Sequence, residues 1–102
     1  LAHHVYFWLK NPESKEDLAQ LLRGANTLTS IETIKGFHLA VPAATEDRNV
    51  IDNSYQVSWL AFFDSEADEQ IYQVHPTHLK FIEDYGHLWG KVVVYDSVQN
   101  TL

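Results

Sequence analysis

Four short segments of the chain are rich in β-branched and aromatic residues, and each is predicted to be a strand. They cover residues 2–10, 34–41, 55–63 and 88–96. Asn11-Pro12 follows the first of them and Pro42 follows the second, and both are signals for a turn.

Between the first two strands the period of apolar residues changes to that of a helix. We expect a helix from about Ser14 to Thr29, because apolar residues recur at helical spacing at Leu18, Leu21, Leu22, Ala25 and Leu28. Ser14 and Asp17 have the spacing of a capping box, with Asp in the usual place of Glu or Gln.

A second helical region follows the third strand and contains a proline. It begins near Asp64-Ser65-Glu66 and runs to about Val74. His75-Pro76 interrupts it, and because proline is tolerated in a first helical turn, Pro76 is predicted to open a third short helix that Gly86 ends. The order βαββαβ with a broken second helix predicts a single α+β domain of ferredoxin-like fold over residues 1–102.

Both faces of the first strand are largely apolar, which is typical of a strand that is covered on two sides. His4, Tyr6 and Trp8 lie on one face and His3, Val5, Phe7 and Leu9 on the other. We expect the His4 face to meet the helices, which leaves an exposed apolar patch of Val5, Phe7, Leu9, Leu60 and Phe62. Such a patch favours a homodimer in which two sheets close into a barrel, and coverage by the tail from Ser97 to Leu102 is the alternative.

Composition and charge exclude several classes of function. The chain has 102 residues, no Cys and a formal net charge of −7, with its seven basic residues spread singly. Without Cys there are no disulfides, thiol nucleophiles or zinc fingers, and without a basic patch we expect no nucleic-acid partner. No apolar run reaches the ~20 residues that span a bilayer, so no membrane partner is predicted. A cytoplasmic location is expected because no secretory signal is recognised and Cys is absent.

The segment from Tyr72 to His78 is the most distinctive source of chemistry. In the first turn of a helix that Pro76 opens, His78 would stay neutral, because the positive end of the helix dipole disfavours imidazolium. A neutral imidazole can act as a general base, with the Tyr72 phenol holding or polarising a carbonyl beside it. Buried hydrogen bonding within the core is an equally open role for this pair.

Three further residues are weighed as ligand contacts. His75 is expected mainly to cap the helix that Pro76 opens, and contact with a ligand is its second role. His75 and His78 have a spacing that suggests a metal, but Pro76 disturbs the helical period, so no metal is predicted. If the His4 face meets the helices, His4 would meet His78, and Trp59 would line a flat apolar pocket beside them. No motif for a cofactor is present.

The sequence resembles the stress-responsive A/B barrel domain (Dabb) family of the dimeric α/β-barrel superfamily. The opening strand from His4 to Lys10, the third strand running into an acidic helix start, and the motif from Tyr72 through His75-Pro76 to His78 carry this resemblance. The resemblance implies a ferredoxin-like fold and a dimeric barrel, without implying a single activity.

A plant polyketide-cyclase branch of that family implies further site residues. Its catalytic Tyr and His fall on Tyr72 and His78, and a further pocket His falls on His4. A His of that branch is replaced by Val57 and a Tyr by Gly24.

These observations lead to two hypotheses about function. The first is a homodimeric family member that binds a small apolar or aromatic molecule between sheet and helices. The alternative is a cofactor-independent enzyme of polyketide-cyclase or lyase type, with His78 as general base and Tyr72 as its partner. A haem-dependent oxygenase of the wider superfamily is remote, because no residue is singled out as an axial ligand.

Overall fold

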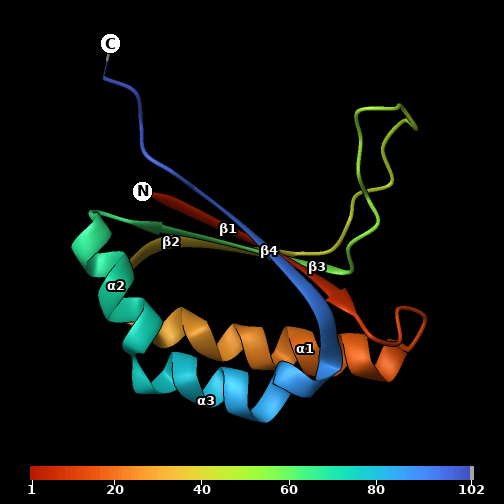
Figure 1. The fold of residues 1–102 in the computed structure, drawn as a ribbon, viewed down its shortest axis with the longest axis horizontal. Helices are drawn as coiled ribbons and strands as arrows, with labels where there is room; N and C mark the ends of the chain where they lie inside the picture. The colour runs from red at the N-terminus through yellow and green to blue at the C-terminus, as the bar shows by residue number, and fades with distance from the viewer. Residues whose placement is uncertain (102) are drawn as a thin grey trace.

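The computed structural model describes residues 1–101 as one antiparallel sheet with helices on a single face (Figure 1). The elements are β1 (Ala2–Leu9), α1 (Lys15–Asn26), the 3₁₀ turn η1 (Thr27–Ser30), β2 (Ile34–Ala40), β3 (Val57–Phe63), α2 (Glu66–Val74), α3 (Pro76–Tyr85), η2 (Gly86–Leu88) and β4 (Trp89–Ser97). The strand order is β2-β3-β1-β4, and every neighbouring pair is antiparallel. The fold is therefore the ferredoxin-like α+β arrangement that the sequence predicts.

The helices begin where the sequence places their caps. The hydroxyl of Ser14 accepts a hydrogen bond from the backbone N–H of Asp17, and Ser65 caps α2 in the same way. His75 ends α2 and is also the N-cap of α3, where its Nδ1 accepts from the N–H of Thr77 at 3.1 Å. The predicted break at His75-Pro76 is thus confirmed, together with the capping role of His75.

The orientation of β1 differs from our expectation. His3, Val5, Phe7 and Leu9 are buried against the helices, and the alternate residues of β1 point to the opposite face. The pairing register explains this, because His4 lies opposite Leu60 in the antiparallel ladder, and residues that pair directly share a face. The prediction that His4 meets the helices, and that Val5, Phe7 and Leu9 are exposed, is therefore wrong.

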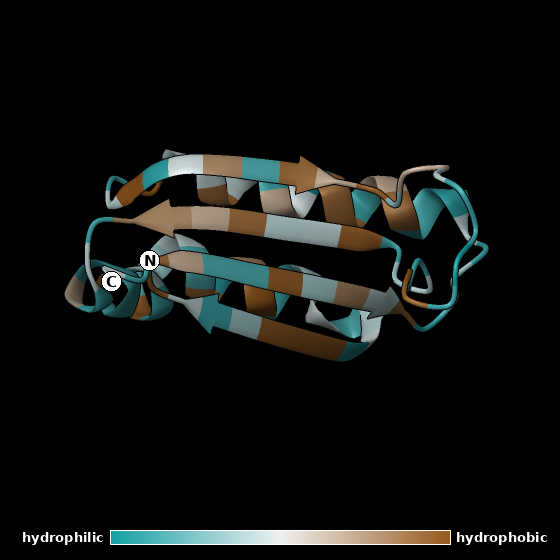
Figure 2. Ribbon diagram, turned by 90° about the horizontal axis from the view of Figure 1, so that it is seen from above, coloured by the Kyte–Doolittle hydropathy of each residue, from teal (hydrophilic) through white to brown (hydrophobic). Residues whose placement is uncertain are grey.

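The sheet face without helices, called the open face below, carries large apolar and aromatic side chains. No helix or loop of the described residues crosses it (Figure 2). By the register, it holds His4, Tyr6, Trp8, Leu60, Phe62, Val93 and Tyr95. The loop between β2 and β3 and the described tail after Ser97 extend past this face at opposite ends of the sheet (Figure 1), so the tail does not cover it.

Within residues 1–101, none of the helices combines the length and the apolar character that crossing a bilayer requires.

Candidate functional site

A pocket of about 120 Å³ lies between the sheet and the helices, and we call it the inner pocket. Its walls are mostly aromatic and aliphatic, with a few polar groups. The lining residues are His3, Val5, Phe7, Leu28, Trp59, Tyr72, Gln73, His78, Phe81, Ile82, Trp89, Val92 and Val94. An apolar pocket with a few convergent polar groups is the usual form of a small-molecule site.

Tyr72 is the buried polar centre of this pocket. Tyr72 is 1% exposed, and its hydroxyl oxygen accepts a hydrogen bond from Nε1 of Trp59 at 3.0 Å. Since an indole N–H only donates, the hydroxyl proton of Tyr72 is left to donate to another acceptor. Burial raises the pKa of Tyr72 well above its ordinary value, so the phenol keeps that proton.

His78 packs against Tyr72 from the first turn of α3. The two ring centroids are 4.6 Å apart, although no hydrogen bond joins their polar atoms. Nδ1 of His78 lies 3.0 Å from the carbonyl oxygen of Gln73, and because a carbonyl only accepts, this nitrogen carries the proton. Burial is the main cause that lowers the pKa of His78, so the neutral ring keeps Nε2 as a proton acceptor.

His3, which the sequence interpretation placed toward the dimer barrel, takes the place expected for His4. The residue is 3% exposed, and its ring lies 5.5 Å from the ring of Tyr72, centroid to centroid. His4 instead stacks on Tyr6 at 4.4 Å on the open face, away from Trp59, Tyr72 and His78. Burial and the neighbouring His38 lower the pKa of His4 there.

His75 does not line the inner pocket. Its Nδ1 caps α3, and its Nε2 lies 3.2 Å from a carboxylate oxygen of Glu32. Because His78 bonds to a different partner, the two histidines do not direct their nitrogens at one point. The expectation that His75 contacts a ligand in this pocket is therefore not supported by its position.

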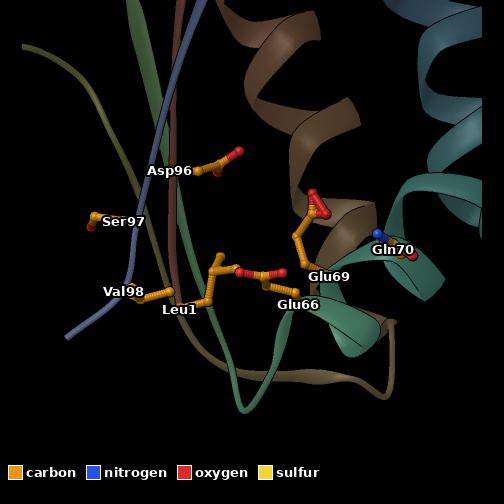
Figure 3. Close-up of a pocket in the computed structure, with 7 residues that line it drawn as sticks. All are labelled: Leu1, Glu66, Glu69, Gln70, Asp96, Ser97 and Val98. Atoms are coloured by element: carbon orange, nitrogen blue, oxygen red, sulfur yellow. The ribbon is translucent and has the colours of Figure 1, made fainter.

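A second hollow, which we call the outer depression, lies where β4 and α2 meet (Figure 3). It has a volume of about 340 Å³ and is lined by Leu1, Glu66, Glu69, Gln70, Asp96, Ser97 and Val98. Among residues 1–101, His3, Glu69 and Asp96 form the one group whose ligand atoms, all within 4.8 Å of one another, could hold a metal ion. However, Nδ1 of His3 and Oδ1 of Asp96 are 2.6 Å apart, so this pair already forms a hydrogen bond.

A third hollow, also about 340 Å³, lies on the open face. Tyr6, Trp8, Tyr55, Tyr95 and the charged Lys91 are among its lining residues. The Lys91 ammonium lies 4.6 Å from the centre of the Trp8 ring, a cation–π contact that already occupies this aromatic surface.

The two positions that depart from the polyketide-cyclase pattern belong to the apolar core. Val57 is fully buried in β3. Gly24 lies so close to Tyr85 that an added Cβ would be 2.5 Å from Cδ2 of that ring. Tyr85 of α3 therefore fills the space in front of this part of α1, where a tyrosine of α1 would clash.

The sheet order, the single layer of helices and the pocket between them define a protein of ferredoxin-like α+β fold. The sequence model of the stress responsive A/B barrel domain (Dabb) matches residues 1–99, and the chain belongs to this family. A comparison with curated proteins finds no match.

Solved structures share this fold over nearly the whole chain. A Dabb family protein with a ferredoxin-like fold from Mesorhizobium loti is 24% identical, with 97% of this chain and 95% of that one covered and a TM-score of 0.79. A hydroxynitrile lyase from Passiflora edulis is 22% identical, with 99% and 94% covered and a TM-score of 0.77. A dimeric ferredoxin-like protein of unknown function from Thermobifida fusca is 18% identical, with 92% and 85% covered and a TM-score of 0.72.

Proposed function

We propose that this protein binds a small apolar or aromatic molecule with one oxygen atom in the inner pocket. The observation that carries the proposal is the Trp59–Tyr72 hydrogen bond. Because Trp59 donates to the Tyr72 oxygen, the phenol can offer its proton to a ligand oxygen inside a largely apolar space. A buried donor without a partner is costly, so the Tyr72 hydroxyl favours a ligand whose oxygen accepts its hydrogen bond.

The volume of the pocket limits the size of the ligand. An apolar protein cavity of about 150 Å³ accepts a benzene molecule. At about 120 Å³, the inner pocket matches a single six-membered ring, so a long unfolded polyketide chain fits it poorly. We therefore favour a ring-sized carbonyl or hydroxyl compound.

The second candidate function is proton transfer on such a ligand without a cofactor. It is favoured by the proton-accepting Nε2 of His78 beside the proton-donating hydroxyl of Tyr72. In this reaction Tyr72 would hold the ligand oxygen while His78 takes a proton from a neighbouring atom. The structural similarity to a hydroxynitrile lyase adds a weaker argument for the same candidate.

A homodimer through the open face is part of the proposal. Phe62 is 44% exposed and Tyr95 is 66% exposed on this face, and exposed apolar surface of this extent usually marks an interface. The similar protein from Thermobifida fusca is described as dimeric. Pairing two copies by a two-fold axis would bury both open faces at once.

The binding proposal is tested by calorimetric titration with cyclohexanone, which only accepts hydrogen bonds, and methylcyclohexane, which neither donates nor accepts. We expect cyclohexanone to bind more tightly, by the threefold to tenfold that about one hydrogen bond contributes. Tyr72→Phe should remove this preference and leave the affinity for methylcyclohexane unchanged. Equal affinities for the two probes in the native protein would contradict the proposal.

A further inference from the structure

Two histidines lie in one row across the middle of the open face, and we call it the histidine row. Leu60 of β3 pairs with His4 of β1 on one side and with His38 of β2 on the other, so these three side chains share this face. Tyr95 of β4 extends the row, because it is the direct partner of His4 on the other side. The two imidazoles are separated by two strand spacings, about 10 Å.

The open face carries almost no charge while its histidines are neutral. None of the strand residues that the register places on this face is Asp or Glu, although the chain has 14 acidic residues. Lys91 is the one residue among these strand positions that is charged at neutral pH, and Asp52 of the β2–β3 loop lines the same hollow. A strongly charged partner therefore finds little to pair with here, whereas a second copy brings the same apolar and aromatic surface. The β2–β3 loop and the tail after Ser97 extend past the face at opposite ends and leave the sheet between them free for that copy (Figure 1).

The surroundings of His4 do not stabilise its charged form. On its own strand, Tyr6 stacks on the ring at 4.4 Å between centroids, and the Tyr6 hydroxyl lies 3.2 Å from Nδ1 of His4. Its direct neighbours from β3 and β4 are the uncharged members of the histidine row. Burial, followed by the nearby His38 and His3, lowers the pKa of His4 already in the single chain. Covering the face with a second copy removes more water, which penalises an imidazolium further.

We propose that the open face is a pH-dependent contact between two copies of this chain, which forms while His4 and His38 are neutral and weakens when they are protonated. The inference rests on the homodimer of the proposed function and adds a condition to it. In the dimer four imidazoles lie in one apolar interface, and each proton that they take up puts an unpaired charge there. In the monomer the same imidazoles keep contact with water. Protons therefore bind the monomer more tightly than the dimer, and the two copies separate by mass action as the pH falls.

The direction of this effect is opposite to that of the net charge. The formal net charge of −7 makes two copies repel each other, and protonation of histidines makes this charge less negative. Net charge alone therefore predicts a tighter dimer at pH 5.5 than at pH 7.5, whereas the histidine row predicts a weaker one.

Sedimentation velocity at steps between pH 7.5 and pH 5.5 measures the dissociation constant of the dimer, with circular dichroism to show that the chain stays folded. We expect this constant to rise at least about tenfold at pH 5.5, because each of the four imidazoles contributes a factor of about two when its pKa falls modestly in the interface. In His4→Gln/His38→Gln the rise should be less than about threefold. His87→Gln is the matched control and should keep the native rise, since His87 is exposed in η2, outside the strands of the open face.

The outcomes separate this inference from the proposed homodimer. A native protein that is dimeric at both pH values, with an equal or smaller dissociation constant at pH 5.5, overturns the inference alone. A weakening at pH 5.5 that persists in the double variant also overturns it, because other groups then cause the effect. A native protein that is monomeric at pH 7.5 overturns the homodimer and the inference together.

Discussion

Removing the hydroxyl of Tyr72 tests how strongly the centre of the inner pocket depends on one hydrogen bond. In Tyr72→Phe the indole N–H of Trp59 loses its acceptor. Because Trp59 is 1% exposed, water does not easily take the place of the lost hydroxyl oxygen. A buried donor without a partner costs about 1–3 kcal/mol. With the denaturant sensitivity typical of small domains, this should lower the urea midpoint by about 1 M.

The assay is equilibrium unfolding in urea, followed by circular dichroism at one fixed protein concentration. Tyr85→Phe is the control, because the hydroxyl of Tyr85 has no hydrogen bond within residues 1–101. Removing this hydroxyl should change the free energy of unfolding by less than about 0.5 kcal/mol. In Trp59→Phe/Tyr72→Phe both polar partners are gone, so the two single losses should not add. If Tyr72→Phe unfolded at the same midpoint as Tyr85→Phe, our account of the Trp59–Tyr72 bond would be refuted.

Three further predictions concern the dimer, the α1–α3 contact and pH. Phe62→Glu should give a monomer in light scattering, whereas Val74→Glu, also at an exposed apolar residue but on α2, should leave the mass unchanged. Gly24→Ala should destabilise the protein by up to about 2 kcal/mol in urea unfolding, because the clash of the new methyl group with Tyr85 outweighs the better helix propensity of Ala. In a Tyr85→Ala background the clash is gone, so the same substitution should stabilise the protein. Burial lowers the pKa of His78 in the folded protein, so the unfolded chain binds more protons and the free energy of unfolding falls as the pH drops below the unfolded-state pKa near 6.5. His78→Gln should make the thermal midpoint less dependent on pH in this range. The same pH dependence in the variant and the native protein would contradict this prediction.

Local patterns in the sequence were sufficient for the elements and their order. Helix starts are marked by local interactions, within three residues, at Ser14, Ser65 and Pro76. Such signals can be recognised without knowledge of the tertiary fold. The proximity of Tyr72 and His78 also follows from a local feature, the break between α2 and α3. These parts of the site could therefore be predicted.

The face of β1 could not be predicted in the same way. Its two faces are both apolar, so alternation does not say which one meets the helices. The answer depends on the pairing of His4 with Leu60, some 56 residues further along the chain, a register that no local pattern encodes. For that reason His3 was missed as a pocket residue.

The polar partners of the pocket are non-local as well. Asp96 reaches His3 only because β4 pairs with β1, and Trp59 meets Tyr72 only because α2 packs on β3. An acidic residue at the end of the last strand carries no distinctive signal in the sequence. Only a prediction of the register between β1 and β4 would have identified Asp96 as the partner of His3.

The location of ligand binding tests the account most directly. Two-dimensional ¹H–¹⁵N NMR of the labelled protein, titrated with cyclohexanone, reports which backbone amides sense the ligand. We predict that the largest shift changes fall on Tyr72, Gln73 and His78, which line the inner pocket. Changes confined to Tyr6 and Tyr95 on the open face would place the ligand on the other side of the sheet and contradict the account.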